Sequence, residues 1–362
     1  MVEDIASGAG LIVVGFGVSY LMSLSFKILA ARYLGAVNFG VFAVGGAIVS
    51  LAGLGVAGAD RAVARLLPRN EENAIKRAII RDGAKVVLVT GIGLGVTLFA
   101  MSGWIADVLT NQVSNPAVIR VFAVAVPATV AMKFSIGATR GLKWTTPTVV
   151  VQRIVIPAAK LVLGTTAALI GLGSMGFAWA YTGAMILGGG IGLAFLVYSI
   201  PAAAGKAYDY GKKAILRAAL PLMVVTGANV VYTSIDTLMV GYFDATGEVG
   251  IYRASWMVSR VTLVPLLGMA FLAMPTLSEL HSKGDMKGVN KIYSLTVKWI
   301  SLASLPVLTA FVSFPGLIMT TIFGEEYASG AAVLIILSSG FFTHCVMGNN
   351  EGLMISVEGR RD

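Results

Sequence analysis

Apolar runs of about 20 residues follow one another along almost the whole chain, and they constrain its fold more than any other feature. A helix needs roughly 20 mostly apolar residues to cross the hydrocarbon core of a bilayer. On that rule we predict ten membrane-spanning helices, at residues 9–31, 39–59, 84–105, 117–137, 149–171, 176–199, 218–240, 250–276, 293–314 and 331–351. Only 12% of the residues are charged, about half the ~25% of a soluble domain. The chain is therefore predicted to be an all-α polytopic membrane protein.

The connections between these runs alternate in charge. Most of the 27 Lys and Arg residues lie in one set of connections and at the C-terminal end, within 60–83, 140–143, 206–217, 283–291 and 360–361. The opposite set carries acids such as Asp107, Asp244 and Glu325. Because cytoplasmic loops are enriched in Lys and Arg, we expect a cytoplasmic-membrane protein with both termini in the cytoplasm. The net charge of +9 then reflects topology, and no nucleic-acid partner is expected.

The basic connection 60–83 has two interpretations. It can form a short amphipathic helix on the inner membrane surface, or it can be a solvated loop whose charges fix the topology, and we favour the loop. The first apolar run follows MVEDIASGAG, which has no basic segment of the kind that opens a cleaved signal peptide. We therefore expect this run to be retained as a span.

A weak internal repeat divides the chain into two parts. Asp236 follows Lys27 by the same number of residues as Tyr242 follows Tyr33. After one inserted residue, Gly250 follows Gly40 and Tyr252 follows Phe42, again at a common spacing. Six predicted spans lie between the copies, so the copies keep the same orientation, as in parallel repeats. We predict an N-terminal lobe at 1–201, a cytoplasmic linker at 202–217 and a C-terminal lobe at 218–362 with four spans.

The same stretches resemble a known family. ARYLGAVNFGVFAVGGAIVSLAGLGVAGADRAVAR is similar to the opening hairpin of polysaccharide-type flippases of the MOP superfamily, which includes MATE antiporters and lipid II flippases. SIDTLMVGYFDATGEVGIYRAS and FPGLIMTTIFGEEYASGAAVLIILSSG resemble the second half of that family. Its members usually have twelve to fourteen spans, so the resemblance implies that two to four spans are missing at the C-terminus.

Charged residues inside the spans are the candidate site, since such residues are costly in a membrane and usually face a bundle interior or a water-filled cavity. Arg260 is the strongest candidate: it is deep in its span and shares a helix face with Arg253, seven residues earlier. Lys160 is similarly deep. Lys27 is shallower and can instead extend to the membrane surface. Asp236 is a gating or ion-coupling candidate that can pair with Arg253, although a purely structural ion pair fits as well.

The remaining polar residues within or near the spans have structural interpretations. Pro157 is expected to kink the helix that carries Lys160, and Arg153 is expected to extend to the inner surface. Arg120 and Lys133 are expected to anchor the ends of their span. The sequence has one cysteine and two histidines and no paired nucleophile and base or phosphate-binding loop. We therefore expect no metal site, no cofactor and no enzymatic activity.

Three functions remain open. The first is a flippase that moves a polyprenyl-diphosphate oligosaccharide across the membrane for surface polysaccharide or glycoconjugate synthesis. It would work by alternating access of two lobes around a cationic cavity, and polysaccharide-assembly enzymes are expected partners besides the bilayer and the lipid-linked substrate. The second is a MATE-like antiporter, which needs buried carboxylates, yet Asp60, Asp82 and Asp107 fall at span ends. The third is a truncated scaffold that transports nothing.

Overall fold

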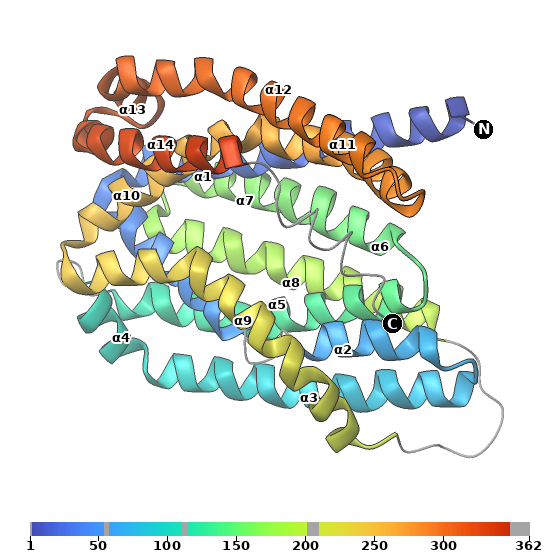
Figure 1. Ribbon diagram of the computed structural model, residues 1–362. Helices are drawn as coiled ribbons and strands as arrows, with labels where there is room; N and C mark the ends of the chain where they lie inside the picture. The colour runs from blue at the N-terminus through green and yellow to red at the C-terminus, as the bar shows by residue number, and fades with distance from the viewer. Residues whose placement is uncertain (1, 54–57, 111–114, 201–209, 348–362) are drawn as a thin grey trace. The chain divides into compact units, whose positions relative to one another are not determined.

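The computed structural model describes residues 2–53, 58–110, 115–200 and 210–347. The described residues are almost entirely helical and contain no β-strand (Figure 1). The chain forms two compact units, Met1–Gly250 and Ile251–Asp362, and helix α10 crosses from one to the other. The division into lobes at 202–217 stays a prediction, and residues 201–209 of that linker lie outside the described residues.

The first unit is a bundle of long helices with short helices between them. Its elements are α1 (Val2–Ala52), α2 (Ala59–Leu66), the 3-10 turn η2 (Leu67–Arg69), α3 (Asn73–Ala100), α4 (Ser102–Leu109), α5 (Pro116–Gly141), α6 (Thr146–Val149), the π-helical segment η3 (Val150–Val155), α7 (Ile156–Ile170), α8 (Gly173–Ser199), α9 (Lys212–Phe243) and the start of α10 (Thr246–Ser259). α5 packs against α1, α3 and α8, so it is the central helix of this unit.

The second unit continues from α10 through a short break. It contains the 3-10 segment η4 (Arg260–Leu263), α11 (Val264–Ser282), α12 (Met286–Ser313), α13 (Pro315–Phe323), η5 (Glu325–Gly330) and α14 (Ala331–Met347). The α12 helix packs against both α11 and α14. The end of the predicted last span, at 348–351, lies outside the described residues.

Seven helices of the described part are long and apolar enough to cross a membrane. The first of them runs from Gly17 to Ala52 and is interrupted at Gly35, whose φ of 72° belongs to the left-handed region. Glycine reaches that region without the steric penalty of a Cβ, so the break separates the two spans predicted at 9–31 and 39–59. The all-α polytopic fold is therefore confirmed, in rough agreement with the predicted helix count.

The connection 60–83 is more ordered than expected. Helix α2 and turn η2 occupy Ala59–Arg69, and α3 already begins at Asn73. Ala59, Ala62, Val63 and Leu67 are buried, because the apolar side of this short helix packs on α5. The favoured interpretation as a solvated loop is wrong for these residues. Packing the apolar side of the helix on α5 lowers the free energy more than solvating these residues as a loop would.

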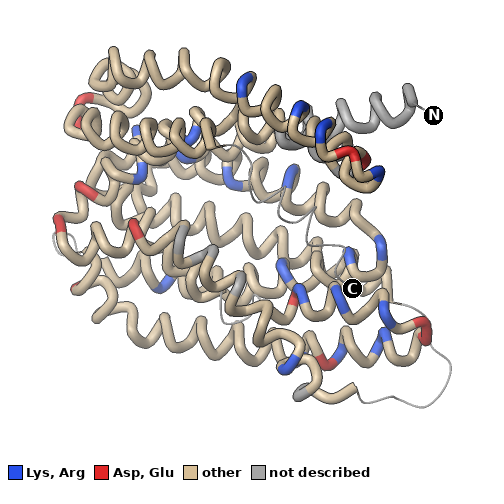
Figure 2. Tube along the Cα trace, viewed as in Figure 1, with Lys and Arg blue, Asp and Glu red and all other residues tan. Residues whose placement is uncertain are grey.

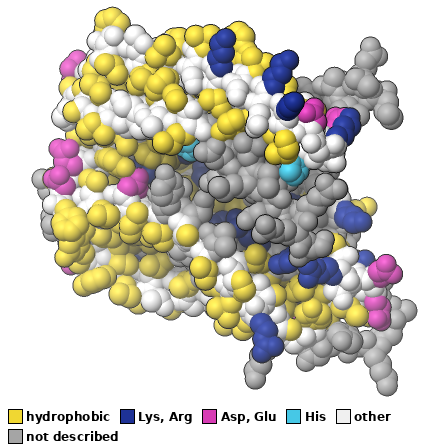
Figure 3. All heavy atoms as spheres, viewed as in Figure 1, with side chains coloured by type: hydrophobic (Ala, Val, Ile, Leu, Met, Phe, Trp, Pro, Cys, Tyr) yellow, Lys and Arg dark blue, Asp and Glu magenta, His cyan; other side chains and the backbone are white. Residues whose placement is uncertain are grey.

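Large apolar side chains cover much of the molecular surface. Leu169, Val89 and Val197 are 84%, 74% and 69% exposed, and the face drawn in Figure 3 is largely apolar. Soluble monomers rarely expose contiguous apolar patches larger than a few hundred Å², whereas helices in lipid need such a surface. Figure 2 shows most Lys and Arg residues of the first unit toward the end of its bundle where α2 lies. This distribution agrees with the alternation of charge between successive connections in the sequence.

The two copies of the repeat touch one another within the first unit. A methyl group built on Gly40 would overlap the carbonyl oxygen of Thr246 and lie 3.2 Å from the backbone nitrogen of Gly250. A methyl group on Gly250 would overlap the carbonyl oxygen of Ala36 and lie 3.1 Å from the nitrogen of Gly40. The contact is reciprocal, as expected where equivalent segments meet at a two-fold axis. Glycine at both positions lets α1 and α10 approach backbone to backbone.

Candidate functional site

Lys160 lies on an irregular helix of the first unit. The segment η3 (Val150–Val155) is π-helical, and the regular helix α7 begins at Ile156, just before Pro157. Proline has no N–H to donate and clashes with the preceding turn of a regular helix, so the wider π turn accommodates Pro157 where a kink was expected. Such π segments occur frequently at functional sites. Lys160 follows one turn later.

The Lys160 ammonium group rests on an aromatic ring. Its Nζ lies 4.0 Å from the centroid of the Tyr181 ring, which comes from α8. Lys27 of α1 is close enough that its charge acts on Lys160. The structure thus brings together two of the predicted site residues, from α1 and α7, and adds an aromatic partner. A cation over an aromatic face is stabilised by about 0.5–2 kcal/mol, the larger value applying where water is excluded.

An aromatic cluster holds Tyr181 in place. Its ring centroid lies 5.3 Å from that of Phe122, which in turn lies 5.5 Å from that of Phe42, and Phe42 lies 6.0 Å from Phe26. Phe26, Phe42 and Phe122 are all buried. A methyl group on Gly45 would overlap the Phe122 ring, so this glycine admits the ring. The cluster joins α1, α5 and α8 and forms a rigid support for the ring beneath Lys160.

Arg253 and Arg260 share one aromatic side chain in the second unit. The guanidinium carbon of Arg253 lies 4.4 Å from the Trp256 ring centroid, and that of Arg260 lies 4.7 Å from it. Trp256 follows Arg253 by three residues and precedes Arg260 by four, so helical geometry places all three on one side. The prediction that the two arginines share a face is confirmed.

The helix is interrupted directly at Arg260. The segment η4 (Arg260–Leu263) is 3-10 helical and leads into α11. Within it the carbonyl oxygen of Thr262 accepts hydrogen bonds from the Ser304 hydroxyl at 3.1 Å and the Cys345 thiol at 3.4 Å. A break in a membrane helix is tolerated where neighbouring side chains satisfy the freed backbone groups. Here α12 and α14 supply these donors, so the backbone two residues after Arg260 is held by its neighbours.

Asp236 is half-buried on α9. Its Oδ1 accepts hydrogen bonds from the backbone nitrogen of Thr237 at 2.6 Å and from the Thr237 hydroxyl at 3.1 Å. Its proposed ion pair with Arg253 stays a prediction. No group of three or more His, Cys, Asp or Glu side chains that could hold a metal ion occurs among the described residues.

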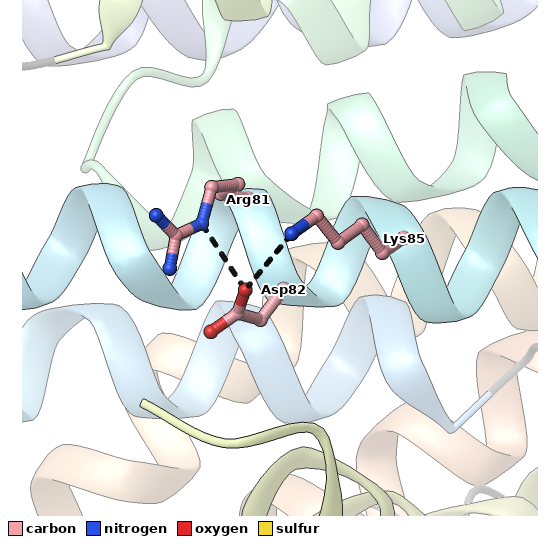
Figure 4. A network of polar contacts seen from close by, with 3 residues as sticks. All are labelled: Arg81, Asp82 and Lys85. Atoms are coloured by element: carbon pink, nitrogen blue, oxygen red, sulfur yellow. Dashed lines mark hydrogen bonds and ion pairs between the residues drawn. The ribbon is translucent and has the colours of Figure 1, made fainter. Parts of the chain in front are cut away.

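Asp82 is more buried than expected. The sequence places it at the edge of a span, but it lies inside α3 and is 2% exposed. Figure 4 shows its Oδ1 between two cations, 3.2 Å from Arg81 Nε and 4.0 Å from Lys85 Nζ. The burial was not predicted, because α3 begins eleven residues before the apolar run at 84–105 and packs this polar extension inside the bundle. The first half therefore does contain a buried carboxylate.

A second carboxylate lies at the start of α2. The Asp60 side chain faces α5, where Gly137 leaves room for its backbone, and its Oδ1 is buried with no hydrogen-bond partner. Burial raises the pKa of the Asp60 carboxyl above its ordinary value, although the Arg61 backbone N–H and the charge of Lys133 offset part of this shift. Lys133, expected to be an interface anchor, is thus a half-buried neighbour of Asp60.

Asp60 should therefore make stability depend on pH. A raised pKa in the folded state favours folding at low pH, and this contribution is lost as the pH rises through the raised value. Asp60→Asn should reduce the difference in apparent melting temperature between about pH 4 and about pH 8. Asp107→Asn, which changes an exposed carboxyl of α4, should leave the difference unchanged. An Asp60→Asn profile that parallels the wild type would contradict this role of burial.

Comparisons with known proteins agree with this architecture. A family profile described as "Polysaccharide biosynthesis protein" matches residues 5–281. The "Probable low-salt glycan biosynthesis flippase Agl15" of Haloferax volcanii is 25% identical over 175 residues, which are 44% of this chain and 37% of that protein. The alignment thus spans little more than a third of that relative's length.

Two solved structures show the same fold at low sequence identity. "Lipid II flippase MurJ, inward closed conformation" has a TM-score of 0.69 at 13% identity, covering 96% of this chain and 78% of that one. An inward-facing "multidrug resistance MATE family transporter of the MOP superfamily" has a TM-score of 0.64 at 15% identity, covering 94% and 83%.

Proposed function

Because the chain belongs to the family of polysaccharide biosynthesis proteins, we propose that it is a flippase for a lipid-linked oligosaccharide. The cargo is an oligosaccharide on a polyprenyl diphosphate, moved across the cytoplasmic membrane by alternating access. One relative and one structural neighbour are both named as flippases, which supports the transport class. Both termini would lie in the cytoplasm, on the side of the basic connections.

The observation that carries this proposal is the sign of the charges inside the predicted membrane spans. Lys27 and Lys160 lie near each other in the first unit, and Arg253 and Arg260 flank Trp256 in the second. Cations are expensive in lipid, so clusters of them usually mark a substrate or ion path. A diphosphate is the anionic part of the cargo, and guanidinium groups bind phosphate oxygens with paired N–H donors.

A cation-coupled multidrug antiporter is the second candidate, because Asp82 supplies a buried carboxylate in the first half. The contacts of Asp82 weigh against this role. Its Oδ1 already lies between Arg81 and Lys85, so the charge that would bind a transported cation is compensated within α3. We therefore favour the flippase. A scaffold without transport activity is distinguished by the experiment below.

Removing the membrane-embedded cations should slow transport of the cargo. We expect Lys160→Ala and Arg260→Ala each to lower the rate on the order of tenfold, since a hydrogen bond to a charged group contributes about 1.5–3 kcal/mol. The measurement is translocation of a fluorescent polyprenyl-diphosphate oligosaccharide in proteoliposomes. Lys298→Ala removes an exposed cation of α12 and should transport at the wild-type rate.

Melting temperatures of the purified variants separate lost transport from lost folding. If folded Lys160→Ala and Arg260→Ala proteins both transport as fast as wild type, the cations have no role in cargo binding. If the wild-type protein moves no cargo while accumulating or exporting cationic drugs, the antiporter replaces the flippase. Absence of both activities would favour the scaffold.

A further inference from the structure

Trp256 contacts both Arg253 and Arg260. The distances of 4.4 and 4.7 Å from its ring limit the separation of the two guanidinium carbons, which is no greater than the two distances taken together. The two guanidinium groups carry like charges and repel each other, most strongly where water is scarce, so a third group is needed to keep them near each other. The indole ring therefore has a role beyond filling space.

Contact with the indole ring is compatible with anion binding by the arginines. A guanidinium group stacks on an aromatic ring through its flat face, whereas its N–H donors point outward in its own plane. Contact with the indole therefore does not occupy the donors that phosphate oxygens need. Two guanidinium groups fixed against one ring present two sets of such donors in the same neighbourhood.

The backbone around the ring is also fixed. The Ser259 hydroxyl donates to the carbonyl oxygen of Trp256 at 2.9 Å. The break at Arg260 is anchored by the hydrogen bonds from Ser304 and Cys345 to Thr262. Since long arginine side chains lose considerable rotamer entropy when they are ordered, a ring that orders them in advance lowers the loss on binding.

We propose that Trp256 is a positioning residue that holds Arg253 and Arg260 as a pair for one diphosphate group. This inference rests on the proposed function and deepens it: the pair selects a lipid diphosphate over a lipid monophosphate. A diphosphate has two phosphoryl groups and engages both arginines, whereas a monophosphate engages one set of donors fully. Trp256 acts through the arginines and itself makes no bond to the phosphates.

Selectivity between the two lipids tests the proposal directly. Binding of a polyprenyl diphosphate and of the matching polyprenyl monophosphate is measured on the whole protein in nanodiscs. Trp256→Leu should weaken diphosphate binding by about tenfold, the loss of two cation–π contacts, and change monophosphate binding little. Trp256→Phe keeps an aromatic face and should fall between Trp256→Leu and wild type. Trp299→Leu, at a 51% exposed tryptophan of α12, should preserve the wild-type selectivity.

The outcomes separate this proposal from the function on which it rests. If wild type binds the diphosphate lipid selectively and Trp256→Leu keeps the same ratio of affinities, the positioning role is overturned and the flippase stands. If wild type binds neither lipid, the proposed cargo and the role of Trp256 are both overturned. If Trp256→Leu fails to fold, Trp256→Phe still tests the proposal. An intermediate ratio of affinities for the two lipids supports the positioning role, and an undiminished ratio overturns it.

Discussion

Valine at Gly40 should remove most of the transport activity and lower the apparent melting temperature, whereas valine at Gly46 of the same helix should do neither. A side chain at Gly40 meets the backbone of Thr246 and Gly250. Backbone atoms cannot relieve this overlap by a change of rotamer, as a flexible side chain can. Overpacking at such a contact costs about 1–3 kcal/mol. A methyl group at Gly46 meets nothing within 4 Å.

The reciprocal contact predicts a reciprocal result. Gly250→Val should reproduce the defect of Gly40→Val, because its side chain would meet the carbonyl of Ala36. Both proteins are compared with Gly46→Val by thermal unfolding in detergent and by transport in proteoliposomes. Equal melting temperatures and equal transport for Gly40→Val and Gly46→Val would mean that α1 and α10 do not approach this closely in the membrane.

The glycine pair also illustrates what a repeat in the sequence can reveal. Gly40 and Gly250 are recognisable as equivalent positions because they keep the spacing of their neighbours. Equivalence alone does not predict contact, since repeats can be related by an axis that passes far from any given position. The contact follows from the packing of α1 on the start of α10, which is a tertiary property. The sequence therefore indicated the symmetry but not where the copies touch.

The two aromatic partners of the cations also differ in how far the sequence reveals them. Trp256 lies three residues after Arg253 and four before Arg260, so helical spacing could have associated the three, although the sequence prediction named only the two arginines. Tyr181 comes from a different helix than Lys160, and no local spacing connects them. Its role depends on how α7 packs against α8. Likewise, hydropathy located the spans but not the extension of α3 before its apolar run, because polar residues continue a helix beyond that run.

Phe122→Ala should be among the most destabilising single substitutions in the first unit. Phe122 is fully buried and contacts the rings of both Phe42 and Tyr181. In a membrane the transfer of the ring from lipid contributes little, because lipid tails are themselves apolar. The cavity and the lost packing remain, so we expect a loss of about 3 kcal/mol, the low end for buried phenylalanines. Phe243→Ala, at a 77% exposed ring of α9, should change stability far less.

A double substitution shows whether the cavity is the cause. Gly45→Val alone should destabilise the protein, because its side chain would overlap the Phe122 ring. In the Phe122→Ala background the same valine enters the space that the ring has left, so it should restore part of the lost stability. Contacting residues that share a cavity give coupling energies of about 0.5–3 kcal/mol in such cycles. Additive effects would contradict direct packing between the two positions. Because Tyr181 rests on Phe122 and Lys160 rests on Tyr181, transport should recover together with stability if this cluster positions Lys160 for the cargo.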